Sequence, residues 1–365
     1  MHRTTRSTLT TSPTRALSRG ALSAAALLAV AGLAACGDAT EQSDGASAAP
    51  DAASTDDVLT VYSGRTENLV QPLLDQVAEE TGATVDVRYF DSADLALLIE
   101  QEGERSPADV FISQSPGALG YLNDLGVLTE LEPEVLDLVS EDFQATDGRW
   151  VGMSGRVRTL VYNSDLVEAS ELPASVFDLT DPQWSGRIGL PPTNGSFQDF
   201  VTALRETEGD EAALEWLEGI AANEPLTYSN NSATLQAVAA GEVEVGLVNH
   251  YYNYRALAED PSLPTVNHFF APGDIGNLNI VTGVAVVETT DDAELANDFV
   301  EFMLGEEAQT FFSEETFEYP LVEGVEPGTD LPPIADLGIA TFDVNSLGGG
   351  LERTQELIAE SGLEG

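Results

Sequence analysis

The sequence contains no lysine, and its 14 arginines face 63 aspartates and glutamates in a chain of 365 residues. Four of the arginines lie before residue 36, where no acidic residue occurs, so residues 36–365 carry 10 basic and 63 acidic side chains, a net charge of −53. This charge repels nucleic acid and anionic membrane surfaces, which excludes both as partners. We interpret the acidity as solvated surface. Each remaining arginine is therefore a candidate for binding carboxylate, carbonate or phosphate.

Cysteine is limited to Cys36, which follows a segment typical of a targeting sequence. Arginines precede an apolar run over 21–35 that is short for a membrane span and rich in small residues, so we predict a signal peptide over 1–35. The run Leu33-Ala34-Ala35-Cys36 looks like a bacterial lipobox, which predicts lipid attachment at Cys36; the alternative is an unmodified cysteine in an ordinary signal peptide. Residues 36–57 are small and acidic and predict a flexible tether.

Motifs of hydrolytic enzymes are also missing. The sequence has no Gly-x-Ser-x-Gly and no His-Glu-x-x-His, and only His250 and His268 follow the predicted signal peptide. We therefore expect no enzymatic activity, with a lipid-anchored hydrolase as the least favoured alternative.

Alternating strand and helix patterns predict an α/β fold with a mainly parallel sheet. Strands are expected over 58–62, 84–89 and 109–113, with helices between them, and the pattern restarts with a strand over 155–163. Ligands of such sheets bind at the carboxyl ends of the strands. We therefore expect one rim to carry the side chains of Tyr62, Arg65 and Gln114.

Two turns in the second half of the chain are typical of anion sites. Asn194-Gly195-Ser196 precedes a helix expected over 197–205, and Asn231 lies just before a helix expected over 233–240. Free amide groups and the positive end of the helix dipole favour anions at such positions.

The stretch from Val245 to Arg255 ends an apolar strand and then presents Tyr251, Tyr252 and Tyr254. A trivalent cation favours the deprotonated phenol, so two neighbouring tyrosines suit ferric iron. They converge only if the chain enters a helix, which Asn249 as N-cap and Pro261 as stop allow. The local pattern alone favours the alternative, in which these tyrosines are packing aromatics or a stacking platform for a sugar.

These stretches, together with Val61-Tyr62-Ser63-Gly64-Arg65, Ala108-Asp109-Val110-Phe111 and Glu318-Tyr319-Pro320, resemble the bacterial ferric-ion-binding proteins, the iron(III) solute-binding proteins of ABC importers. The resemblance implies a two-lobed, type II periplasmic-binding-protein-like fold, each lobe a mainly parallel sheet flanked by helices, with a cleft between the lobes. We expect lobe 1 over 58–155 plus 283–330 and lobe 2 over 156–282 plus 331–365.

The resemblance also implies a ligand set. Tyr251 and Tyr252 match the family's paired phenolate ligands of Fe3+. A synergistic anion, carbonate or bicarbonate or phosphate, is expected at Arg156 or Arg158 and at five further residues: Asn194, Gly195, Ser196, Asn231 and Asn249.

The first lobe departs from the family pattern. Thr66 and Gln114 stand where some members have a ligand histidine and a ligand glutamate, and Phe197 stands where others have a tyrosine. A neutral amide is a weaker ligand of a hard cation than a carboxylate. The candidates to complete the coordination sphere of the iron are oxygens of the anion or of water, or Tyr62 and Glu67. We assign His250 an orienting role and His268 a structural one.

The expected function is capture of ferric iron and its delivery to an ABC permease by a monomeric lipoprotein anchored on the extracytoplasmic face. The alternative is a solute-binding protein for a polyamine, thiamine or an organic phosphate. In the polyamine case Tyr251 and Tyr252 act as a cation–π wall.

Overall fold

The computed structural model describes residues 57–322, 324–328, 331–348 and 350–363, which fall into one compact unit. The predicted signal peptide, Cys36 and almost all of the predicted tether lie outside the described residues. Within the described chain, none of the helices has the length and apolar character needed to cross a membrane.

The first three strands form a parallel sheet, as the sequence predicts. Strand β1 (Val58–Ser63) lies between β2 (Thr84–Tyr89) and β3 (Val110–Ser113), and both pair with it in parallel register. These strands and the helices packed on them are called the first half below. Strand β9 (Asn279–Val286) pairs antiparallel with β3 and continues the sheet.

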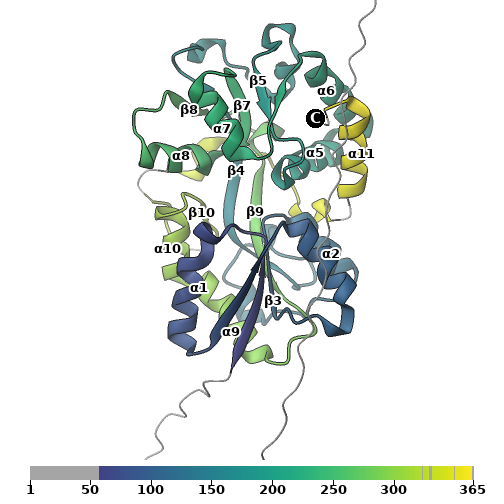
Figure 1. Cartoon of the computed structure of the whole chain (residues 1–365), viewed down its shortest axis with the longest axis vertical. Coiled ribbons are helices and arrows are strands. Elements are labelled where there is room, and N and C mark those ends of the chain that lie inside the picture. Colours follow the sequence, from purple (N-terminus) through teal and green to yellow (C-terminus); the bar gives the residue numbers. More distant parts are fainter. Residues whose placement is uncertain (1–56, 323, 329–330, 349, 364–365) are drawn as a thin grey trace, which may run out of the picture. The chain divides into compact units, whose positions relative to one another are not determined.

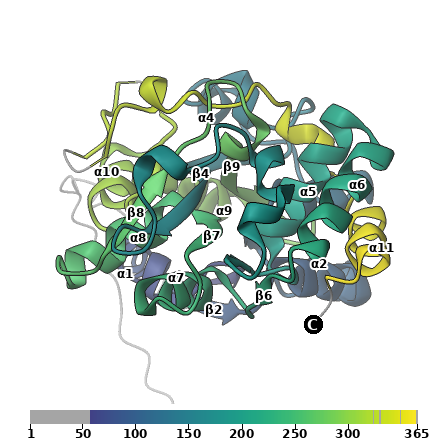
Figure 2. The same ribbon diagram turned by 90° about the horizontal axis from the view of Figure 1, so that it is seen from above.

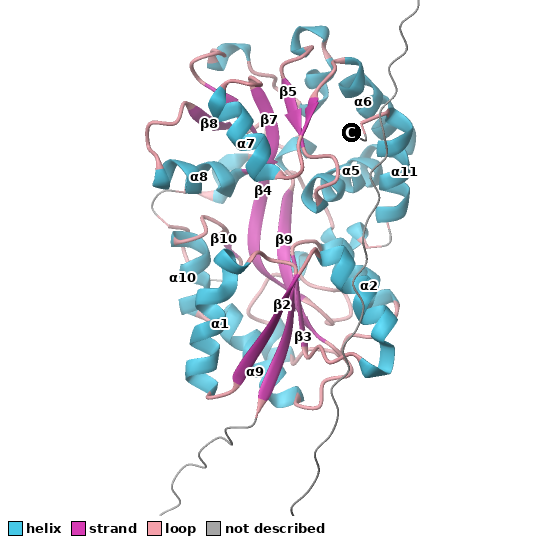
Figure 3. Ribbon diagram, viewed as in Figure 1, coloured by secondary structure: helices cyan, strands magenta, loops and turns pink. Residues whose placement is uncertain are grey.

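The long strand β4 (Val151–Asn163) connects the first half to a second set of strands (Figures 1 and 3). It pairs antiparallel with β9 at its start and with β7 (Val245–Asn249) and β8 (Thr265–His268) at its end. Strand β5 (Ile188–Leu190) pairs in parallel with β7 and with β6 (Leu226–Thr227), and these strands with their helices are called the second half. The parallel pairing is thus confined to the outer strands of each half.

Helices cover the sheet in both halves (Figures 1 and 2). In α1 (Glu67–Thr81) the predicted apolar stripe at Leu69, Val70, Leu73, Leu74 and Val77 is buried. The other helices of the described chain are α2 (Ser92–Glu102), α3 (Pro116–Asp124), α4 (Pro133–Leu136), α5 (Gly195–Glu208), α6 (Asp210–Ala222), α7 (Asn231–Ala240), α8 (His250–Glu259), α9 (Ala293–Leu304), α10 (Glu306–Glu314) and α11 (Leu351–Ser361). Strand β10 (Tyr319–Pro320) adds a short antiparallel pair to β4.

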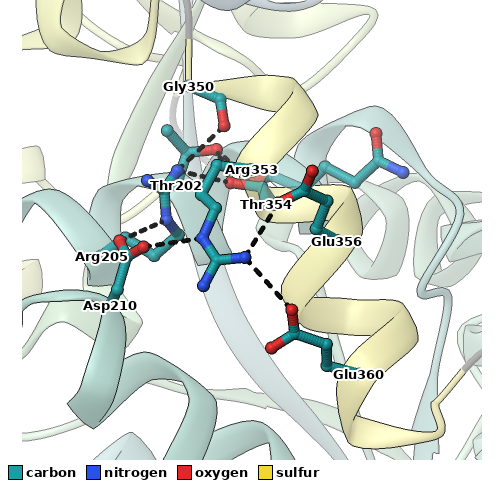
Figure 4. Close-up of polar contacts among 9 residues, drawn as sticks. Thr202, Arg205, Asp210, Gly350, Arg353, Thr354, Glu356 and Glu360 are labelled. Carbon is teal, nitrogen blue, oxygen red and sulfur yellow. Dashed lines mark hydrogen bonds and ion pairs between the residues drawn. The ribbon is translucent and has the colours of Figure 1, made fainter.

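The C-terminal helix α11 packs on the second half. Leu357 and Ile358 join a core that contains Trp184 and Trp216. Polar contacts reinforce this packing (Figure 4): Arg353 bridges Asp210 at 2.8 Å, and the Arg205 side chain donates to the Gly350 carbonyl at 2.9 Å. The C-terminus of the chain therefore belongs to the core of the second half.

Candidate functional site

Tyr251 and Tyr252 lie at the start of α8, directly after β7 ends at Asn249. The chain thus enters a helix where convergence of the two phenols requires it, and the rings stack with centroids 4.2 Å apart. Tyr251 is fully buried, and its hydroxyl has no hydrogen-bond partner among the described residues. Burial raises the pKa of Tyr251 well above its ordinary value, so the free phenol is protonated at neutral pH.

Asn249 occupies the N-cap position of α8, but its side chain does not cap the helix. Its Oδ1 instead accepts a hydrogen bond from Arg158 Nη1 at 3.0 Å. The predicted helix start is therefore right, while the side chain expected to cap it is held by the arginine of the neighbouring strand β4.

Arg158 is the centre of a buried polar cluster without a carboxylate partner. Its Nη1 lies 3.4 Å from both Ser196 Oγ and Asn231 Oδ1, while its Nε and Nη2, like Nδ2 of Asn249, have no partner in the described chain. Asn194 accepts from Ser196 and Asn231 and caps α5. Burial lowers the pKa of Arg158 to about 9, which leaves it a cation at neutral pH.

The structure therefore brings together five of the residues predicted to hold an anion: Arg158, Asn194, Ser196, Asn231 and Asn249. Gly195 begins α5 beside them, and a side chain there would meet no neighbouring atom within 4 Å. The cluster thus offers unpaired donors beside a helix N-terminus, which is an arrangement that favours an anion.

Arg156, two residues earlier on β4, is also buried but points its donors toward the first half. Its Nη2 donates to the backbone carbonyl of Gln114 and to that of Val281 at 3.2 Å. Close by, Asp199 accepts from Ser115 Oγ at 2.6 Å, and burial raises the pKa of this carboxyl to about 6 against the opposing effect of Arg156 and Arg158. The two arginines of β4 thus serve different halves of the molecule.

Arg65 lies against the tyrosine pair, with its guanidinium carbon 5.8 Å from the centroid of the Tyr251 ring. It forms a fully buried ion pair with Glu318, which also accepts from the hydroxyl of Ser154. Phe317, just before Glu318, has a φ of 57°, in the left-handed region that costs a bulky residue about 1–3 kcal/mol. This strained residue directly precedes the carboxylate that pairs with Arg65.

The remaining predicted rim residues of the first half do not join this group. The Tyr62 hydroxyl lies 3.1 Å from Glu102 and 3.2 Å from Arg88. The side-chain amide of Gln114 donates to the backbone of Gly64. Thr66 is exposed, with its hydroxyl on Asn68.

His250 is fully buried and stacks on Tyr319 with centroids 5.0 Å apart. Its Nδ1 accepts the N–H of Val157 at 3.1 Å, and burial lowers the pKa of the imidazole to about 3, so the ring is neutral. The contact fixes the start of α8 to β4. His268, whose Nε2 lies 2.8 Å from the Pro173 carbonyl, has the place of a structural residue.

Sequence reasoning gave no role to Asp199, to Glu318 or to Thr282, whose hydroxyl accepts a hydrogen bond from Arg65 Nη1 at 3.4 Å. Glu318 lies in a stretch that carries the family resemblance, whereas Asp199 and Thr282 have no local signal. Among the described residues no three His, Cys, Asp or Glu side chains form a group that could hold a metal ion.

Comparison with known proteins identifies the family of this chain. The model of the bacterial extracellular solute-binding protein family matches residues 105–335. The Fe(3+)-binding periplasmic protein of Serratia marcescens is 30% identical over 86% of this chain and 92% of its own length. Iron-bound HitA from Pseudomonas aeruginosa superposes with a TM-score of 0.81 at 35% identity, covering 84% of this chain and 99% of HitA.

A second solved structure is FutA (IdiA) from Trichodesmium in complex with iron and citrate ligands, with a TM-score of 0.71 at 29% identity over 84% of this chain and 99% of that one. These relatives are binding proteins and not enzymes, in line with the expectation from the sequence, and HitA carries the predicted type II periplasmic-binding fold. The chain belongs to the bacterial extracellular solute-binding proteins and, among them, to the ferric-ion-binding protein family.

Proposed function

We propose that the protein captures ferric iron on the phenolate oxygens of Tyr251 and Tyr252. The observation that carries the proposal is the fully buried Tyr251 hydroxyl, which has no hydrogen-bond partner in the described chain and stacks on a second phenol. A buried polar group without a partner costs free energy, so a ligand that engages it has a clear advantage. The relative from Serratia is named for Fe(3+), and HitA from Pseudomonas has been solved with iron bound.

Phenolate ligation couples iron capture to pH. Because burial raises the pKa of Tyr251, the phenol is protonated before binding and must release its proton to the solvent when iron binds. Iron affinity should therefore fall as the pH decreases from neutral to mildly acidic. An affinity that does not change over this range would argue against phenolate ligands.

The cluster around Arg158 supports a synergistic anion next to the metal. Two donors of Arg158 and one of Asn249 are free in the described chain, and carbonate, bicarbonate or phosphate would accept from them. The anion would add oxygen ligands that the first half does not supply, because Gln114 is engaged with Gly64 and Tyr62 with Glu102. Lobe closure, with the boundaries expected from the sequence, would complete the site.

A cationic solute such as a polyamine or thiamine fits this site poorly. Arg65, Arg156 and Arg158 are all buried close to the tyrosine pair or to its flanking strand, and only Arg65 has a carboxylate ion-pair partner. An organic cation would add a further positive charge beside these arginines. Ferric iron is also a cation, but it binds together with two phenolates and an anion, whose negative charges balance its own.

In transport, the closed iron-loaded form would deliver the ion to an ABC permease. We propose that Cys36 carries the lipid that holds this monomeric protein on the extracytoplasmic face. Incorporation of labelled palmitate, lost in Cys36→Ser, would test the anchor.

The direct test of the binding site is a visible absorption titration of the purified protein with ferric iron, with and without bicarbonate or phosphate. A ferric phenolate produces a charge-transfer band, whereas an organic cation or organic phosphate does not. We expect a band that saturates at one iron per protein and needs the anion for full strength. No band with any iron source would overturn the proposal.

A further inference from the structure

One hydrogen bond between the two halves lies outside the proposed iron site. Ser115 is the N-cap of α3 in the first half, and its Oγ donates to Oδ1 of Asp199, on α5 of the second half, at 2.6 Å. The side chains of Tyr62 and Gln114 bond within the first half. The Ser115 side chain is therefore an exception among the rim residues of the first half, because its partner belongs to the other half.

The Ser115 hydroxyl is oriented for this contact by the first half itself. Its oxygen accepts the N–H of Gly117 at 3.1 Å, which leaves the hydroxyl proton for Asp199. Ser113 fixes the backbone, because its hydroxyl donates to the Ser115 carbonyl at 2.8 Å and accepts the Ser115 N–H at 3.0 Å. A first side-chain carbon at Gly117 would lie 3.5 Å from Asp199 Oδ1 and 3.2 Å from the Leu347 carbonyl. The glycine thus leaves room for the second half to approach.

Asp199 depends on this hydrogen bond because its carboxyl is buried. The residue is 5% exposed, its Oδ2 has no partner, and among the described residues Ser115 is its one hydrogen-bond donor. Burial raises the pKa of Asp199 to about 6, and Ser115 opposes this rise more strongly than Arg156 or Arg158 does. The carboxyl is therefore mostly ionised at neutral pH. Without Ser115 it would be a buried anion that lacks a hydrogen bond.

Closure of the two halves decides how firmly a metal on Tyr251 is held. Tyr251 is fully buried, and Arg65 of the first half lies against its ring, so the halves enclose the phenols in what we call the closed form. The apparent affinity for a ligand enclosed in this way depends on how strongly the closed form is populated. We infer that Ser115 is a latch, whose hydrogen bond to Asp199 holds the halves in the closed form that retains iron. The inference rests on the proposed iron site, because the latch acts on the metal only through closure.

Loss of the Ser115 hydroxyl would make the closed form costly. In that form Asp199 would be a buried carboxylate without a donor, whereas in an open form water could bond to it. The population would therefore shift toward the open form. The phenols themselves are unchanged, so the absorption of a ferric phenolate should stay at the same wavelength.

The test is the iron affinity of the purified protein, measured by competition with the chelator EDTA in a double-mutant cycle of Ser115→Ala and Asp199→Ala. We expect Ser115→Ala to lower iron affinity about 10- to 100-fold, the range for a hydrogen bond to a charged group, with the phenolate band unshifted. In the Asp199→Ala protein the same substitution should change the affinity by less than about 2-fold, because no carboxylate is left to satisfy. Ser115→Thr keeps the hydroxyl and should bind iron as the wild type does.

Ser140→Ala is the matched control. Ser140 is also an N-cap in the first half, where its Oγ accepts the N–H of Asp142 at 3.5 Å, and it has no hydrogen bond to the second half in the described chain. Its substitution should leave iron affinity unchanged. Chemical denaturation of the iron-free variants completes the control, because a residue that only caps a helix lowers stability without lowering iron affinity.

Two results would overturn the inference. Wild-type iron affinity in Ser115→Ala would mean that the bond does not hold the closed form. An equal loss of affinity with and without the Asp199 carboxylate would assign the effect to the cap of α3. Failure of the proposed function looks different, because then the wild type itself shows neither iron binding nor a phenolate band.

Discussion

The two halves of the molecule differ in how they hold the candidate ligand side chains. In the first half these side chains have partners: Tyr62 bonds to Glu102 and Arg88, Gln114 to Gly64, and Arg65 to Glu318, although Arg65 Nε has no partner among the described residues. In the second half the hydroxyl of Tyr251 and two nitrogens of Arg158 have no partner among the described residues. Buried groups in folded proteins rarely lack partners, so we expect the second half to be the one that binds the ligand.

The contrast also explains how one half can serve as a support for the other. Arg65 lies against the ring of Tyr251, and the Gln114 carbonyl accepts a hydrogen bond from Arg156. Both residues are also held by contacts of their side chains, Arg65 with Glu318 and Gln114 with Gly64. They can position the ligand residues of the second half without changing partners when a ligand binds. We therefore expect first-half substitutions near the site to alter stability, and second-half substitutions to alter binding.

The largest expected effect is that of removing a phenol from the second half. Tyr251→Phe should abolish most of the charge-transfer band and lower iron affinity by more than the roughly 10- to 100-fold typical of an outer partner of a metal ligand. Tyr62→Phe, which removes an equally buried phenol of the first half, should keep both the band and the affinity. Equal losses of iron affinity in the two variants, measured by iron titration, would contradict the proposed difference between the halves.

The buried ion pair between Arg65 and Glu318 should contribute to the free energy of unfolding. Glu318→Gln leaves the Arg65 cation buried without a carboxylate, and we expect the free energy of unfolding to fall by about 3–5 kcal/mol in chemical denaturation. Glu102→Gln is the matched control, because Arg88 and Glu102 lie 3.8 Å apart and Arg88 is half exposed, so we expect less than about 1 kcal/mol. A Glu318 variant as stable as the control would contradict the structural role.

The smallest expected effect is the pH dependence due to Asp199, which links the halves through Ser115. Its pKa is raised from 3.8 to about 6, so between these values the folded protein binds more protons than the unfolded chain. Stability should therefore fall by about 1–3 kcal/mol as the pH rises from 4 to 6, and Asp199→Asn should lack this component.

The control for this prediction has the opposite sign. Arg353 and Arg205 lower the pKa of the exposed Asp210 (Figure 4), so its contribution is lost as the pH falls. Asp210→Asn should weaken the acid destabilisation of the wild type. Denaturation curves across this pH range that show no difference between the Asp199 variant and the wild type would refute the assignment.

Much of this architecture can be read from the sequence. The strand over 84–89 has the predicted limits, and the helix after residue 66 shows the predicted buried stripe, because local periodicity determines which face is buried. The predicted anion residues other than Arg156 are brought together because Arg158 of β4 pairs with Asn249 at the end of β7, and the others lie at the starts of α5 and α7. The predicted lobe boundaries stay a prediction.

Side-chain partners were harder to predict, because they depend on contacts between distant segments. Nothing in the local pattern around Tyr62 shows that its hydroxyl lies on Glu102, 40 residues away. The same holds for Arg65 and Glu318, which are separated by 253 residues. Alternation along β4 places Arg156 and Arg158 on the same face of the strand, but their different partners follow from the antiparallel pairing with β9 and β7.

The most direct test of the central claim is a crystal structure of the iron-loaded protein, with the metal located by anomalous scattering at the iron absorption edge. The account predicts a single strong peak within bonding distance of the phenolic oxygens of both Tyr251 and Tyr252, with an anion against Arg158. A peak bound instead at Tyr62 or at surface carboxylates, with the Tyr251 hydroxyl still unpartnered, would contradict it.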